Sequence, residues 1–403
     1  MRPFGTLIPF EEAKRIIDAN VAPIMRVETI SIDDSLNRVL AEDIIATQNT
    51  PPFDRAAVDG YAVRARDIFN VSRLNPKIFN IVDVLYAGST PKRRLAAGAG
   101  ECIQVATGAR MPQGADAVVM IEDTTREDDR VKIVKSAYPK ANVAQKGEDI
   151  KKGELVLKQG SVLDPAKMGV LACQGMSQVK VYEKPKVVVI PTGEEISEVG
   201  KRLNQGQIYD VNSHTISAVV QGNGCLPVKF SIISDDPQEI KAAIEEALKA
   251  DLVVISGGSS VGERDLLFGI LQEWGEVLFH GIQIKPGKPT MFALVRSKPV
   301  LGMPGYPTSC LMNAYLFLEP ALRKMAHLPP KRGLTVAVRL SERVHGSIGR
   351  KQFLPVTVEA DKAIPIFKES GSITGTAKAD GYIIINENID ILEKGEPVTV
   401  TLF

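Results

Sequence analysis

The sequence predicts a multidomain protein of the α/β plus β class, in which a central α/β domain with a mainly parallel sheet is flanked by β domains. Three observations predict this class. The chain has 403 residues, more than one hydrophobic core usually contains. From Pro185 onward, near-continuous Val/Ile strands alternate with helices, which is typical of a parallel sheet covered on both faces. Before and after that region, short β-branched runs are separated by Gly, Pro and charged turns.

The N-terminal segment predicts two short helices. Apolar residues at helical spacing follow Pro9, so we expect a helix over 9–20 and a second one over 33–40. Residues 146–158 resemble a β hairpin and residues 164–181 a helix, and neither segment has a core of its own. We therefore expect both to return and pack with the N-terminal helices.

The region from Pro51 predicts a compact all-β unit. Its expected strands are 79–84, 101–105, 117–121 and 131–134. After Pro329 and Pro330 the helical periodicity ends, and a small terminal β barrel is expected. Its expected strands are 334–340, 353–358, 382–385 and 398–403.

The central α/β region has one well-marked helix start. Asp236 is a good N-cap, Pro237 suits the first helical position, and Glu239 follows as in a capping box. That helix should run to about residue 250. The other expected strands are 186–190, 228–233, 251–256 and two near Gln283 and Val300, and the other expected helices are 213–221, 266–274 and 307–325.

Composition excludes several functional classes. With 44% hydrophobic and 24% charged residues, the chain is typical of globular proteins. The formal net charge is +1, so no global field attracts nucleic acid or an anionic membrane, and any anion site must be local. No stretch approaches the ~20 apolar residues of a membrane span. Acidic Glu11 and Glu12 interrupt the N-terminus before a signal peptide could form.

The cysteines and histidines argue against a metal site built from them. The four cysteines form no CxxC pair, which disfavours a zinc knuckle and a disulfide framework and suggests a reducing cytoplasm. No two histidines have metal-ligand spacing. The cysteines are Cys102, Cys173, Cys225 and Cys310.

The strongest chemical signal is a Gly/Ser loop after the strand that ends at Ser256. Its backbone N–H groups can turn toward one point and cradle a phosphate. The alternative is a tight strand-to-helix turn that binds nothing. The loop is favoured as a site because it follows the carboxyl end of a strand in an open α/β sheet. The residues of this candidate phosphate cradle are Ser256, Gly257, Gly258, Ser259, Ser260, Val261 and Gly262.

Two further loops should leave the same edge of the sheet. One contains Thr192, Gly193 and Glu195, and the other contains Pro304 and Gly305. Three polar or Gly-rich loops at one edge bring backbone donors and carboxylates together, which favours a site there.

The segment 284–289 places Lys285 and Lys288 on a stiff Pro-Gly framework. Both ammonium groups can be held near one anion at little entropic cost, although a basic surface turn is the alternative. Carboxylates would supply ligands for a hard cation such as Mg²⁺, although any one acidic loop residue is more often simply solvated. The candidates are Asp59, Asp149, Glu195, Asp235, Asp236 and Asp265.

One string of residues then resembles a known family. The segment PPFDRAAVDGYAV, residues 51–63, looks like the signature of the MoeA and gephyrin E-domain family. Further motifs occur in the family's order up to about residue 310, including ATGARMPQGADAVVMIEDT, KGEDI, IPTGEEI, IYDVNSHTI, SDDPQEI, ISGGSSVGERD, IKPGKPT and LGMPGYPTS. Together they are highly specific.

The resemblance implies four domains. These are an elongated domain from residues 1–48 and 145–182, an inserted β domain from 49–144, an α/β domain from 183–327 that resembles molybdopterin adenylyltransferase, and a C-terminal β barrel from 328–403. It also implies a homodimer whose site lies between the β domain of one subunit and the last two domains of the other. The adenylyltransferase that makes the substrate is a further expected partner.

The implied reaction takes adenylylated molybdopterin and molybdate with Mg²⁺, hydrolyses the adenylate and inserts the metal into the dithiolene, releasing AMP. A tungstate-using paralogue remains an alternative, because the two oxyanions have similar size and charge. A non-catalytic scaffold is a second alternative, and adenylylation of molybdopterin by the α/β domain is a third. The location implied is cytoplasmic.

The resemblance also implies roles for individual residues. Mg²⁺ would be bound by Asp59, Glu195 and Asp265, and molybdate or phosphate oxygens by Lys285, Lys288 and Arg350. The positions that match functional positions of the family are Asp59, Thr107, Asp149, Glu195, Asp235, Asp236, Asp265, Lys285, Lys288, Arg350 and Ser372.

Tyr306 departs from the family, which often has Asn there. We hypothesise that its larger side chain alters which pterin or oxyanion fits. The hypothesis fails if Tyr306→Asn leaves both ligand affinity and metal preference unchanged.

Overall fold

The computed structural model describes residues 6–257 and 266–403, and the chain forms two compact units. Unit 1 contains the N-terminal residues through Glu28, residues 37–39 and residues 181–403. Unit 2 contains residues 29–36 and 40–180. Among the described residues, no helix is long and apolar enough to cross a membrane.

Unit 1 contains the predicted α/β sheet. Its strand order is β16-β13-β17-β21-β20-β18. The bounds are β13 (Lys186–Pro191), β16 (Leu226–Lys229), β17 (Leu252–Ser256), β18 (Gly275–His280), β20 (Met291–Val295) and β21 (Lys298–Met303). Strands β16, β13, β17 and β21 are parallel, whereas β20 and β18 are antiparallel additions that were not predicted. The mainly parallel sheet is confirmed.

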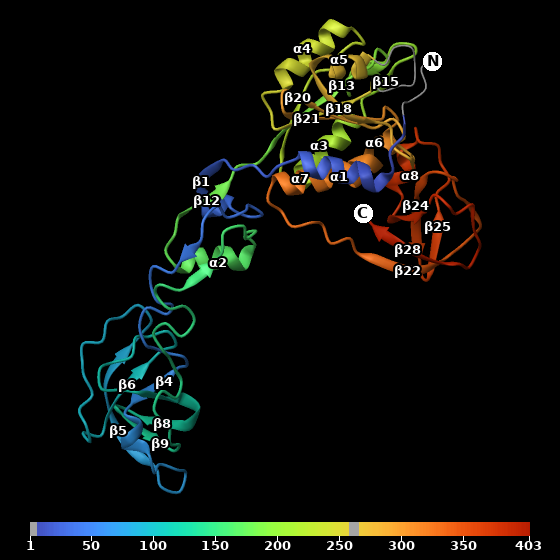
Figure 1. The fold of residues 1–403 in the computed structure, drawn as a ribbon. Coiled ribbons are helices and arrows are strands. Elements are labelled where there is room, and N and C mark those ends of the chain that lie inside the picture. The colour runs from blue at the N-terminus through green and yellow to red at the C-terminus, as the bar shows by residue number, and fades with distance from the viewer. Residues whose placement is uncertain (1–5, 258–265) are drawn as a thin grey trace. The chain divides into compact units, whose positions relative to one another are not determined.

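Helices cover both faces of this sheet (Figure 1). On one face, Val187 and Val189 of β13 pack in a core with α1 (Phe10–Asn20), α3 (Asn212–Gly222), α6 (Pro307–Asn313) and α7 (Glu319–Met325). On the other, Val188 and Ile190 pack with α4 (Pro237–Ala247) and α5 (Leu266–Trp274). Because side chains of a strand alternate between faces, one apolar run supplies two cores.

The predicted helix starts and lengths hold well in unit 1. Asp236 caps α4, accepting a hydrogen bond from Gln238 N at 2.6 Å. The carboxylate of Glu239 accepts from the Ser234 hydroxyl at 2.6 Å rather than from the cap residue. The helix expected over 307–325 is present, but its winding changes to a π-helical turn at Ala314–Leu318.

The C-terminal strands close into the predicted barrel. Strand pairings run β24-β25-β22-β28-β26 and return to β24. The bounds are β22 (Thr335–Leu340), β24 (Lys351–Glu359), β25 (Lys362–Pro365), β26 (Gly381–Ile385) and β28 (Pro397–Leu402). The strand expected near Gln283 is β19 (Ile284–Lys285), and it pairs with β24 of the barrel instead of joining the α/β sheet.

Small elements complete unit 1. They are β14 (Ile196–Ser197) with β15 (Ile208–Tyr209), β23 (Val344–His345) with β27 (Ile391–Leu392), and α8 (Ile373–Ala377).

Unit 2 contains the predicted β region, with strand order β7-β4-β6-β5-β9-β8. The bounds are β4 (Gly60–Val63), β5 (Lys77–Leu85), β6 (Glu101–Val105), β7 (Ala117–Met120), β8 (Thr124–Glu127) and β9 (Arg130–Ile133). Its core includes Phe79, Cys102 and Val131. Short pairs join β3 (Arg55–Ala56) to β10 (Val143–Ala144), and β2 (Ile44–Ile45) to β11 (Leu155–Leu157).

Two predictions for the ends of this region are wrong. The helix over 33–40 is only a 3-10 turn at Ile32–Asp34, because Ser35 bonds back to Ile32 O and Asn37 adopts φ +61°. The hairpin over 146–158 does not form, since β11 pairs with β2. The expected packing of this region against the N-terminal segment is confirmed, but strands β11 and β12 (Gln178–Tyr182) form the contact instead of a hairpin and a helix. Helix α2 (Pro165–Cys173) is shorter than predicted and is followed by β12, which pairs with β1 (Val27–Ser31).

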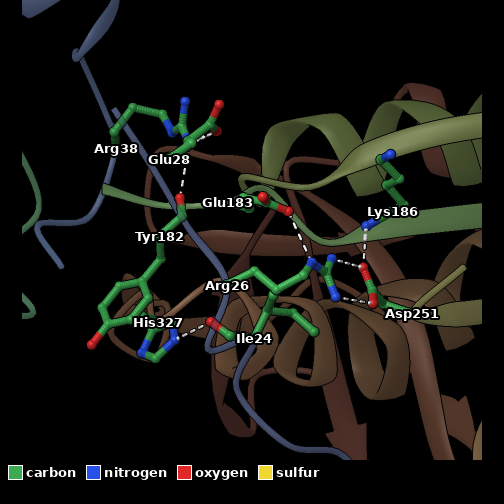
Figure 2. Close-up of polar contacts among 9 residues, drawn as sticks. All are labelled: Ile24, Arg26, Glu28, Arg38, Tyr182, Glu183, Lys186, Asp251 and His327. Carbon is green, nitrogen blue, oxygen red and sulfur yellow. Dashed lines mark hydrogen bonds and ion pairs between the residues drawn. The ribbon is translucent and has the colours of Figure 1, made fainter. Parts of the chain in front are cut away.

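Figure 2 shows a network of contacts in unit 1 that joins four separate chain segments, residues 24–26, 182–183, 251 and 327. Arg26 donates to both oxygens of Asp251 at 2.9 and 2.8 Å and to Glu183 at 2.8 Å. The Tyr182 ring stacks on His327, with ring centroids 3.7 Å apart. His327 Nε2 in turn donates to Ile24 O at 2.8 Å.

Candidate functional site

A cavity of about 1320 Å³ lies in unit 1 at the carboxyl ends of the parallel strands. This is the edge at which ligands bind in open α/β sheets. Loops after β13, β17 and β21 line it, together with the β19 turn and segments of the barrel. The predicted site residues that line it are Thr192, Glu195, Ser256, Gly257, Lys285, Lys288, Pro304, Gly305 and Ser372.

Hydrogen bonds tie the three strand-end loops together. Thr192 N donates to Ser256 O at 2.9 Å, and Gly257 N to Met303 O at 3.4 Å. A Cβ on Gly257 would lie 2.3 Å from Thr192 O, so only glycine permits this approach. The predicted convergence of the three loops is therefore confirmed. Gly193 does not line the cavity, and its N–H donates to Ile233 O at 3.2 Å.

Asn212, at the start of α3, is a cavity residue that was not among the candidates predicted from the sequence. Its Nδ2 donates to Ser256 Oγ at 2.8 Å and to Gly305 O at 2.7 Å. It thus bridges the loops after β17 and β21. The motif IYDVNSHTI contains this residue and could have drawn attention to it.

The C-terminal domain also lines the cavity, through residues 366–372. Thr308 N donates to Ser370 O at 3.0 Å, and Thr308 Oγ1 to Ser372 O at 2.9 Å. These bonds hold Ser372 beside the start of α6. The Tyr306 side chain also lines the cavity and is 66% exposed, so a ligand can reach its ring.

The predicted carboxylates differ in their surroundings. Asp235 is exposed, but desolvation of its carboxyl, followed by the charges of Glu195 and Glu194, raises its pKa. A cation bound between Glu195 and Asp235 would relieve that repulsion. Asp236 serves as the α4 cap. Asp265 and residues Gly258 to Gly262 lie outside the described residues.

These carboxylates fit Mg²⁺ in the way the ion usually binds. Mg²⁺ takes one or two protein carboxylates and fills its remaining positions with water and substrate phosphate oxygens. Within residues 6–257 and 266–403, no group of three or more His, Cys, Asp and Glu side chains could hold a metal ion. Glu195 and Asp235 therefore suit an ion that a phosphate substrate helps to bind.

Two other predicted residues meet in unit 2. Asp59 accepts hydrogen bonds from Thr107 N at 2.6 Å and from Thr107 Oγ1 at 3.0 Å. Asp149 donates through its backbone N–H to Thr50 O at 3.0 Å. Arg350 is exposed in unit 1, just before β24, and does not line the cavity.

Known proteins match this chain along almost its whole length. Residues 8–175 match "MoeA N-terminal region (domain I and II)", residues 188–324 match "Probable molybdopterin binding domain", and residues 337–403 match "MoeA C-terminal region (domain IV)". The chain belongs to the MoeA family. The resemblance inferred from motifs in residues 51–310 thus extends toward both ends.

Individual relatives agree with this assignment. The molybdopterin molybdenumtransferase of Haemophilus influenzae is 33% identical over 93% of this chain and 94% of its own. That of Staphylococcus aureus is 37% identical over 79% of this chain and 76% of its own. A crystal structure of the molybdopterin biosynthesis moea protein from Pyrococcus horikosii is 41% identical, with a TM-score of 0.86 over 98% of this chain and 99% of that one.

Proposed function

We propose that this chain inserts molybdenum from molybdate into adenylylated molybdopterin and hydrolyses the adenylate with Mg²⁺, giving molybdenum cofactor and AMP. Its family and its named relatives support the general role, that of an enzyme of molybdenum cofactor biosynthesis. The cavity carries the finer proposal, because it presents two lysines and a glutamate beside three strand-end loops.

The lysines and carboxylates have complementary roles in this proposal. Lys285 and Lys288 would hold molybdate or phosphate oxygens through charge-assisted hydrogen bonds. Glu195 and Asp235 would hold Mg²⁺, which when bound polarises a phosphoryl oxygen. Ser256, Gly257 and Gly305 would hold the pterin or nucleotide against the sheet edge.

Asp59 and Thr107 belong to unit 2, and we propose that they act in a homodimer. Each cavity in unit 1 would then be completed by the Asp59 and Thr107 pair of a second copy. The short contacts between Asp59 and Thr107 support this pair as a preformed acceptor group. The adenylyltransferase that makes the substrate would be a further partner.

The test is AMP release from adenylylated molybdopterin with Mg²⁺ and either molybdate or tungstate. We expect oxyanion-dependent release by the natural chain and its loss in Asp59→Asn. Release only with tungstate would assign the chain to tungsten cofactor synthesis. Folded protein that releases no AMP with either oxyanion would refute the enzymatic proposal and favour a scaffold role.

Tyr306→Asn belongs in the same assay. If the exposed Tyr306 ring shapes the cavity, the substitution changes the Kd of the pterin substrate or the ratio of activities with molybdate and tungstate. Equal values in both proteins would refute a role for Tyr306 in selection.

A further inference from the structure

The turn that carries the two lysines rests on a buried side chain from a different element. This lysine turn, residues 284–290, lines the cavity through Lys285, Gly287 and Lys288. Beneath it lies Asn313, the last residue of α6, which is fully buried. Asn313 Nδ2 donates to Gly287 O at 3.0 Å and also to Thr290 Oγ1.

The partners of this amide fix its orientation. Gly287 O can only accept, and the Thr290 hydroxyl uses its single proton to donate to the same Gly287 O at 2.9 Å. Both groups that face the Asn313 amide therefore require a donor. Rotating the amide, or replacing it with a carboxylate, would place oxygen against oxygen in a site closed to water.

The lysine turn packs directly against this amide. A Cβ on Gly287 would lie 2.3 to 2.6 Å from the amide atoms of Asn313, and Gly287 has φ +101°. No described residue donates a hydrogen bond to Asn313 Oδ1. A buried polar atom without a partner destabilises the fold, so the amide at this place is accounted for by the hydrogen bonds that its Nδ2 donates to the lysine turn.

We propose that Asn313 is a positioning residue for oxyanion binding. By donating hydrogen bonds to Gly287 O and Thr290, it fixes the backbone between Lys285 and Lys288. This in turn fixes the backbone positions from which the two lysine side chains extend. Preorganised charges lose less freedom when they bind an anion. The inference rests on the proposed function, in which the lysines hold molybdate.

The experiment is calorimetric titration of sodium molybdate into the full-length natural chain, Asn313→Ala and a control, Asn223→Ala. Asn223 is also buried, donates from Nδ2 to Val219 O at 2.8 Å, and lies at the end of α3 away from the lysine turn. We expect Asn313→Ala to raise the molybdate Kd about tenfold, a typical effect of losing a residue that orients a ligating group. Asn223→Ala should leave the molybdate Kd unchanged, even if it lowers the Tm as much as Asn313→Ala does.

A mutant cycle separates positioning from general damage. In a chain that already carries Lys285→Ala and Lys288→Ala, adding Asn313→Ala should have no further effect on the molybdate Kd, because Asn313 acts through those lysines. An additive further loss would overturn the inference. So would an unchanged Kd in Asn313→Ala.

Thr290→Val provides a second test if Asn313→Ala does not fold. It removes the hydroxyl that links Asn313 to Gly287 and nearly keeps the shape of the side chain. We expect a smaller rise in Kd, and no rise would contradict the inference. If the natural chain binds neither molybdate nor tungstate, both the proposed function and the positioning role fail. If every Asn313 and Thr290 variant binds molybdate as the natural chain does, only the positioning role is refuted.

Discussion

Two aspartates at opposite ends of α4 show how differently one residue type is used in the same unit. Asp251 follows the helix and is 8% exposed, and Arg26 binds both of its oxygens. Burial alone would raise the pKa of Asp251, but the hydrogen bonds from Arg26 and Lys186 N outweigh it and lower that pKa. Asp235 precedes the helix beside Glu195 and Glu194, and its pKa is raised.

The difference distinguishes a structural carboxylate from a candidate ligand. The charge of Asp251 is compensated within the fold, so it stabilises the attachment of residues 24–26 to the sheet (Figure 2). At Asp235, desolvation of the carboxyl and the charges of Glu195 and Glu194 disfavour the charged form, and a bound cation would favour it. Substitution of Asp251 should therefore affect stability, whereas substitution of Glu195 beside Asp235 should affect activity.

The strongest effect should be on activity. Glu195→Gln keeps the size of the side chain but removes its charge, so AMP release should fall about 100-fold. Mg²⁺ affinity should fall with it, while the urea midpoint of unfolding stays near that of the natural chain. Full activity in Glu195→Gln would remove this residue from the proposed metal site.

The second effect is on stability. Asp251→Asn places an amide among the donors of Arg26 and Lys186, and we expect a loss of about 2 kcal/mol in the free energy of unfolding. Asp235→Asn should cost nothing, because the folded state disfavours the charged form of Asp235. Urea denaturation of both variants measures the contrast, and equal losses would contradict it.

The free energy of unfolding measured over a series of pH values tests the direction of the Asp251 pKa shift. Because the pKa of Asp251 is lowered by folding, its stabilisation is present above the unfolded-state pKa of about 3.9 and is lost as the pH falls through the lower folded value. The natural chain should therefore lose stability more steeply than Asp251→Asn on acidification through that range. Parallel curves of unfolding free energy against pH for the two proteins would show that Arg26 does not stabilise the charged form of Asp251.

The weakest effect should be a change in a single titration. In Arg26→Gln, the hydrogen bonds and charge of Arg26 no longer lower the pKa of Asp251, so this pKa should rise relative to that in the natural chain. In Glu195→Gln the pKa of Asp235 should fall toward the usual value for an aspartate. Carboxyl carbon NMR titration of the two variants reports both shifts, and movement in the opposite direction would contradict the distinction between the two aspartates.

Most of the fold was predictable because the signals in the sequence are local. The cap at Asp236, the apolar run 186–190 and the helix 266–274 each depend on neighbouring residues, and all are confirmed. The predicted helix over 33–40 failed because propensity there is overridden by turn chemistry at Ser35 and Asn37. Strands β18 and β20 were missed, although their partners are close in sequence: β20 forms a hairpin with β21 through Arg296 and Ser297, two non-glycine residues at positive φ, and β18 pairs with β20.

For the site, residue types and spacing were enough to predict that the three strand-end loops meet, and to single out the two lysines that line the same cavity. Loop residues such as Gly257 and Lys285 can be recognised in this way because their use depends on their own backbone and charge. Three features emerge only in the folded chain: the barrel completes the cavity, Asn212 bridges two loops and Asn313 supports the lysine turn. Each depends on contacts between segments distant in sequence, such as one amide donating to a remote carbonyl, and no periodicity or local motif encodes such a contact.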